Sequence, residues 1–139
     1  MKKSIVLIVI GGLLLFGLIQ LIPVDRTNPA MTKEPNWSSP EARALVKEHC
    51  FQCHSNETEW PWYSYVAPAS WLIKGDVVNG RRIFIYSAWD KNPGRLDEMV
   101  EKIQEGSMPP LQYTIFHPTS KLDAQQKQAL IDALTSTLK

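Results

Sequence analysis

The sequence has almost no net charge and only two cysteines. Lys and Arg total 15 against 14 Asp and Glu, which gives a formal net charge of +1. No basic block is interleaved with aromatic residues, so nothing indicates binding to nucleic acid. Strand-like alternation does not persist long enough for a sheet. At 139 residues, 44% of them hydrophobic, the chain has room for one domain of ordinary size plus a small segment.

The N-terminal segment contains a long apolar run. Lys2 and Lys3 precede an apolar run, Ser4 to Ile22, that only small residues and Gln20 interrupt. The run is about 19 residues long, close to the ~20 that a membrane-spanning helix needs, and no A-x-A-like site follows it. We therefore predict an uncleaved signal anchor over residues 1–22, with cleaved secretion as the alternative.

The positive-inside bias keeps Lys2 and Lys3 in the cytoplasm. It predicts a single-pass protein of the bacterial inner membrane whose soluble part lies in the periplasm. Residues 23–38 are rich in Pro, Asn, Ser and Thr and show no periodicity. They are expected to form a tether, with only Trp37 docking on a domain over residues 39–139.

The chemistry of the chain is concentrated in Cys50-Phe51-Gln52-Cys53-His54, the C-x-x-C-H pattern of covalent c-type haem attachment. On a helix, Cys50 and Cys53 lie on neighbouring edges of one face, where both sulfurs can add to the vinyl groups of a haem. His54 can then bind the iron as the proximal ligand. Three alternatives remain. A thioredoxin-like dithiol expects an alternating strand-helix pattern that the sequence does not show, and a zinc site needs four ligands, which the crowded motif does not supply. The third alternative is a lone structural disulfide.

Three helices are predicted in the soluble part. The first begins at Ser38 or Ser39, through either a capping box with Glu41 or a cap followed by Pro40. Its apolar face is Ala42, Leu45, Val46, Cys50 and Cys53. The second runs from Gly94 to Glu105 and ends at Gly106. The third runs from Asp123 to Leu138, with Asp123 and Gln126 forming its capping box.

Residues 56–89 are unusually aromatic and contain two prolines. We expect loops with short helices, at Ser70–Asn79 and Gly80–Ser87, and aromatic side chains from Trp60 to Trp89 that wall the haem. Arg81 and Arg82 are expected to be exposed, although one of them could pair with a haem propionate.

Met108 is the candidate for the sixth iron ligand. It follows the second helix and is fixed in a loop by Pro109 and Pro110. His117 is the competing candidate for the sixth ligand, since it also lies on a loop. The alternative role for Met108 is to fill the hydrophobic core, as methionines ordinarily do. His49 is on the same helix as His54 and is not expected to reach the opposite face of a haem.

The soluble part resembles the haem-binding domain family of membrane-anchored bacterial c-type cytochromes. The matching stretches are CFQCHSNETEWPWYSYVAPASWLIKGDV, NGRRIFIYSAW and MPPLQYTIFHP. The resemblance implies one haem c attached to Cys50 and Cys53, with His54 as proximal ligand. The chain is also similar, more distantly, to mono-haem cytochromes c, in which a late methionine before proline is the distal ligand. This similarity implies that role for Met108.

The expected protein is an all-α, cytochrome c-like electron carrier with a single transmembrane helix, and not an enzyme. Its expected partners are the membrane and other redox proteins, respiratory complexes among them. If the distal position is open, the alternatives are a peroxidase-like enzyme or a gas or redox sensor. A haem subunit of a larger oxidoreductase is a further alternative.

Overall fold

The computed structural model describes residues 2–139, and over this range the chain forms helices and no β-strand. An isolated bridge joins Lys33 and Ala88. The elements are α1 (Lys2–Ile19), α2 (Pro40–His54), the 3-10 helix η1 (Trp62–Tyr65), α3 (Ala69–Ile83), α4 (Leu96–Glu105), α5 (Leu111–Phe116), the 3-10 helix η2 (Pro118–Ser120) and α6 (Ala124–Leu138). The predicted all-α fold is confirmed.

The chain divides into two compact units. The first consists of the residues up to Thr27 together with Glu59–Asp76, and the second of Asn28–Thr58 together with Val77–Lys139. Helix α1 belongs to the first unit, and none of its 18 residues is buried. It is long and apolar enough to cross a membrane, although an N-terminal signal sequence can meet the same criteria of length and composition.

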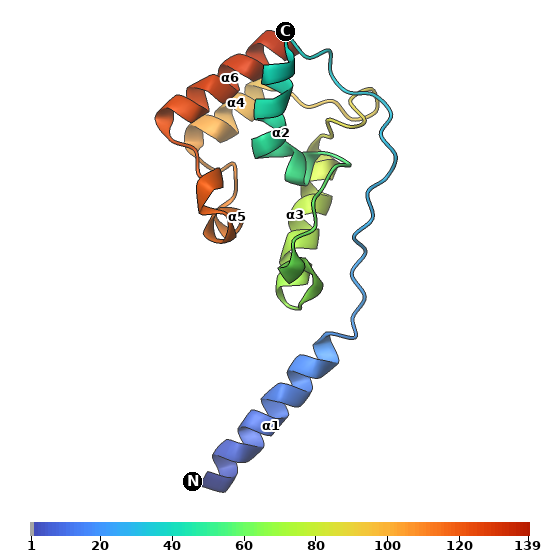
Figure 1. Ribbon diagram of the computed structural model, residues 1–139, viewed down its shortest axis with the longest axis vertical. Coiled ribbons are helices and arrows are strands. Elements are labelled where there is room, and N and C mark those ends of the chain that lie inside the picture. The colour runs from blue at the N-terminus through green and yellow to red at the C-terminus, as the bar shows by residue number, and fades with distance from the viewer. Residues whose placement is uncertain (1) are drawn as a thin grey trace. The chain divides into compact units, whose positions relative to one another are not determined.

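The second unit is built on α2, α4 and α6. Helix α6 contacts both α2 and α4, as Figure 1 shows for the teal, light orange and red helices. Each buried aliphatic or aromatic side chain at this junction contributes about 1.5–3 kcal/mol. The most deeply buried members of the core are Val46, Phe51, Tyr86, Ile103, Leu130 and Leu134.

The observed helix boundaries agree with the predicted ones where a capping residue was identified. Ser39 caps α2 by accepting a hydrogen bond from the amide of Ala42 at 3.1 Å, with Pro40 in the first turn. The alternative cap, Ser38, is instead hydrogen-bonded to Ser136 and Thr137 of α6.

At the other helices, Gly106 ends α4 in the left-handed conformation, with φ 76°. Asp123 and Gln126 form the predicted capping box of α6. Helix α4 begins at Leu96, two residues after the predicted start at Gly94.

The predicted second short helix, Gly80–Ser87, is wrong. Helix α3 runs on to Ile83, and the chain then leaves the helix and passes into turns. The amide of Ile85 donates to the carbonyl of Asn92 at 3.0 Å, and that of Tyr86 to the carbonyl of His54 at 2.8 Å. These bonds to other segments replace the helical ones, because they allow the Tyr86 side chain to be completely buried.

Trp37 docks on the second unit, as the sequence predicts. Its ring centroid lies 6.0 Å from that of Phe51 and 5.5 Å from that of Tyr86. The segment before it is also attached: the side-chain amide of Asn28 donates to the carbonyl of Thr58 at 2.9 Å. Residues 28–37 of the predicted tether therefore pack as part of this unit.

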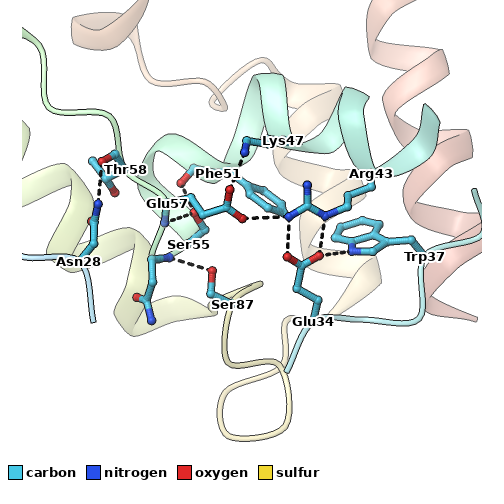
Figure 2. A network of polar contacts seen from close by, with 11 residues as sticks. Asn28, Glu34, Trp37, Arg43, Lys47, Phe51, Ser55, Glu57, Thr58 and Ser87 are labelled. Carbon is cyan, nitrogen blue, oxygen red and sulfur yellow. Dashed lines mark hydrogen bonds and ion pairs between the residues drawn. The ribbon is translucent and has the colours of Figure 1, made fainter. Parts of the chain in front are cut away.

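A network of partly buried charges secures this segment to α2. Figure 2 shows the Arg43 guanidinium between two carboxylates, 2.6 Å from Glu34 and 2.9 Å from Glu57. Glu34 also accepts from the indole of Trp37, and Glu57 pairs with Lys47. The bonds from Arg43 lower the pKa of Glu34, so its carboxylate stays charged.

Replacement of Asp123 by Ala should destabilise the second unit. The change leaves the amide of Gln126 without its acceptor, at a cost of about 1 kcal/mol in the free energy of unfolding. Urea unfolding of the detergent-solubilised full-length protein, followed by circular dichroism, measures the loss. Asp123→Asn retains a capping acceptor and is the matched control. Equal destabilisation by both variants would contradict the capping role.

Candidate haem site

The C-x-x-C-H motif forms the last turn of α2, which ends at His54. Cys50 and Cys53 are half-buried and no disulfide joins them, so the structure gives no support to the alternative of a structural disulfide. Among residues 2–139, no three His, Cys, Asp or Glu side chains are grouped so as to hold a metal ion. The structure of these residues therefore gives no support to the alternative of a zinc site.

His54 is buried and held in a fixed orientation. Its ring stacks on that of Phe84 with centroids 4.0 Å apart and 11° between the planes. Its Nδ1 lies 3.4 Å from the carbonyl oxygen of Phe84. With the proton on Nδ1, the ring donates to this carbonyl and leaves the lone pair of Nε2 for a metal.

Burial lowers the pKa of His54 to about 4, although hydrogen bonds to the carbonyls of Phe84 and Gly80 act in the opposite direction. Near neutral pH the imidazole is therefore uncharged, the form that binds iron. Burial also raises the pKa of the Cys50 thiol to about 12, against a hydrogen bond from Tyr86 that lowers it. A neutral Cys50 thiol and a neutral imidazole suit an apolar surrounding.

A cavity of about 450 Å³ opens beside these residues. Its volume is within the range of about 300–1,000 Å³ typical of small-molecule and cofactor sites. The motif lines one part of the wall with His49, Cys50, Gln52, Cys53 and His54. The rest of the wall comes from residues 83–86, from α4 and the residues before it, and from Met108 to Tyr113.

Met108 lines the same cavity as the motif, together with Pro109 and Pro110. Its amide donates to the carbonyl of Lys102 at 3.2 Å, which ties the loop to the end of α4. His117 is absent from the residues lining the cavity in the described chain, 2–139. Its ring stacks on Tyr113 with centroids 4.3 Å apart. The arrangement favours Met108 over His117 as a ligand from the loop.

The cavity is also lined by three residues that the sequence analysis did not assign to the site, His49, Arg95 and Met99. Their side chains are suited to contacts with a ligand. The Nδ1 of His49 is buried and makes no hydrogen bond within residues 2–139. Arg95 forms ion pairs with Asp97 and Glu98. Met99 is a buried apolar residue of α4, and a methionine at such a position can serve either as core or as cavity wall.

Among the aromatic residues of the second unit, the expectation that residues from Trp60 to Trp89 wall the site is confirmed for Phe84 and Tyr86, which line the cavity, and is wrong for Trp89. The sequence shows aromatic density, which does not reveal where each ring is buried.

Arg81 binds the chain that follows the motif. Its guanidinium donates to the carbonyl of Ser55 at 2.8 Å, to Asn28 at 2.7 Å and to Thr58 at 3.0 Å. Neither Arg81 nor Arg82 lines the cavity in the described residues, so the alternative of a propionate partner finds no support there.

Gly80 allows α3 to approach the motif. A Cβ atom at Gly80 would lie 2.5 Å from the carbonyl oxygen of Cys53 and 2.9 Å from its carbonyl carbon. Both contacts are with backbone, which cannot move without displacing Cys53. A side chain at this position is therefore excluded on steric grounds.

Gly80→Ala should destabilise the protein and reduce the amount of haem bound. Overpacking of this kind costs about 1–3 kcal/mol. The matched control is Gly75→Ala in the same helix, where nothing lies within 4 Å of the added Cβ. It should be neutral or stabilising, because Ala favours helix over Gly by about 0.8–1 kcal/mol. The thermal unfolding midpoint and the haem content per chain test both variants, and equal behaviour would contradict the steric account.

Comparison with known proteins identifies the family. The model of a family described as the haem-binding domain matches residues 14–136. A search of curated proteins and a search of solved structures both returned no match. The match extends over α2, the cavity-lining loops and α6, so the geometry of the site and the family assignment point to the same ligand. The chain belongs to the haem-binding domain family.

Proposed function

We propose that this haem protein is a membrane-anchored mono-haem cytochrome c that carries single electrons at the periplasmic face. One observation carries the proposal: Cys50, Cys53, His54 and Met108 all line a single, largely apolar cavity. The family supports haem as the ligand. The covalent attachment, the single haem and the electron-transfer role are our inferences from the residues.

The residues present fit a covalently attached haem. The two cysteine thiols would supply the sulfur atoms of the thioether bonds, and His54 supplies a neutral imidazole. A haem bound there supplies a one-electron couple between ferric and ferrous iron. The carbonyl of Phe84 orients the proximal imidazole and strengthens it as a ligand.

Met108 completes the proposed ligand set. A thioether ligand favours the ferrous form and raises the reduction potential. With both axial ligands supplied by the chain, the ligand set need not change on reduction, and no open position remains for peroxide or a gas. We therefore infer a carrier and not an enzyme.

The proposed location follows from α1. As an uncleaved anchor, with Lys2 and Lys3 in the cytoplasm, α1 carries the haem domain on the periplasmic side. Partners are then other redox proteins at the same membrane surface, respiratory complexes among them. Contacts of this kind are small and brief, below about 1,200 Å².

Membranes that contain the protein should show a c-type haem. Pyridine haemochrome and reduced-minus-oxidised spectra should give a c-type α band, and the haem should resist extraction with acidified acetone. In the Cys50→Ala/Cys53→Ala variant, no thioether can form, so the band should disappear or its haem should become extractable. An immunoblot controls for the amount of protein. A resistant c-type band in the double variant would refute covalent attachment.

Met108→Leu should open the sixth position. The reduced variant should bind carbon monoxide rapidly where the parent protein does not. Its potential should fall by on the order of 0.1 V, within the ~0.8 V that axial ligands span. Met99→Leu is the matched control, because Met99 also lines the cavity and both changes nearly conserve volume.

The same pair of variants separates the rival assignments. If Met99→Leu alone opens the site, Met99 is the sixth ligand. Rapid binding of carbon monoxide to the reduced parent protein would contradict the electron-carrier proposal and favour a gas sensor or a peroxidase-like enzyme.

A further inference from the structure

We propose that residues 62–72, here termed the interfacial segment, lie in the headgroup region of the membrane beside the end of α1. The segment would then hold the protein at the bilayer surface in addition to the transmembrane helix. The inference rests on the proposed membrane anchoring of α1 and on contacts within the first unit alone.

A pair of hydrogen bonds links the interfacial segment to the end of the apolar run. Gln20 follows α1 directly. Its Oε1 accepts from the amide of Ala67 at 2.8 Å, and its Nε2 donates to the carbonyl of Ala67 at 3.2 Å. The same Nε2 donates to the carbonyl of Phe16 at 3.0 Å. Ala67 is therefore fixed at the level at which α1 ends.

Three further contacts, made by Asp25 and Arg26, hold neighbouring residues at this level. The guanidinium of Arg26 donates to the carbonyl of Ser64 at 2.7 Å and lies 4.2 Å from the centre of the Tyr65 ring. Lys74, just beyond the segment, pairs with Asp25 at 3.3 Å. The chain that leaves α1 is thus attached to the segment and its flank at three places within residues 20–26.

The segment exposes large apolar and amphipathic side chains. Trp62 is 78% exposed, Tyr65 61% and Leu72 60%, and Trp71 is also exposed. Soluble surfaces rarely expose such residues together without a binding role. Trp and Tyr are enriched at membrane interfaces, where the ring meets lipid and its polar atom meets water.

The lipid bilayer is the occupant that fits this surface best, because the surface continues that of α1. No residue of α1 is buried, and Leu21 and Ile22, which follow it, are exposed as well. Within residues 2–139, the hydrogen bonds of Arg26 are to the carbonyls of Ser64 and Val24, so no carboxylate neutralises its charge. A cation at this level is complementary to lipid phosphate.

Fluorine NMR of the full-length holoprotein in phospholipid nanodiscs tests the inference. The protein carries fluorotryptophan, the iron is kept ferrous, and a small fraction of the lipid carries a spin label on its headgroup. Trp62→Phe and Trp37→Phe variants assign the two resonances. Trp37 is the matched control, because its indole is bonded to Glu34 and its ring packs on Phe51.

The labelled lipid should broaden the Trp62 resonance several-fold more than that of Trp37. Retention of the protein in the disc with equal broadening of both resonances would overturn the inference while leaving the anchor intact. Release of the protein by an alkaline wash would contradict the anchor itself, and this inference with it. Broadening of Trp62 that follows the number of protein copies per disc, without spin label, would assign the surface to a second copy and overturn the lipid contact.

Discussion

The contact between the end of α2 and residues 80–86 is the constraint on which the haem site depends. Gly80 lets the backbone of α3 reach the backbone of Cys53, Phe84 stacks on His54, and the amide of Tyr86 binds the carbonyl of His54. These three contacts act on the two final residues of the motif. Together they fix the direction in which the imidazole can present its second nitrogen.

A second set of contacts braces the same helix from the side of residues 28–37. Arg43 joins Glu34 to Glu57, and its guanidinium lies 5.3 Å from the centre of the Phe51 ring. Exposed ion pairs contribute little, but a partly buried network is screened less by salt. Helix α2 is therefore held on both sides, so its last turn is well placed to keep the thiols and the imidazole in one arrangement.

The sequence predicted the parts of this structure that local chemistry determines. Ser39, Gly106 and Asp123 mark helix ends because each satisfies backbone groups a few residues away. The motif itself is also local. The sequence predicted that aromatic residues wall the haem, and Phe84 and Tyr86 do line the cavity. It did not distinguish these two from the other aromatic residues, because their positions depend on hydrogen bonds to His54, which is distant in the sequence. Gly80 gave no local signal either, since its role appears only when α3 meets Cys53.

The paired hydrogen bonds between Gln20 and Ala67 bear on the processing of the chain. Ala67 is buried, so its amide and carbonyl have little access to water. A chain cut after Gln20 would lose both partners, and each buried polar group left without one costs about 1–3 kcal/mol. The folded first unit is therefore more stable with the residues up to Gln20 than without them.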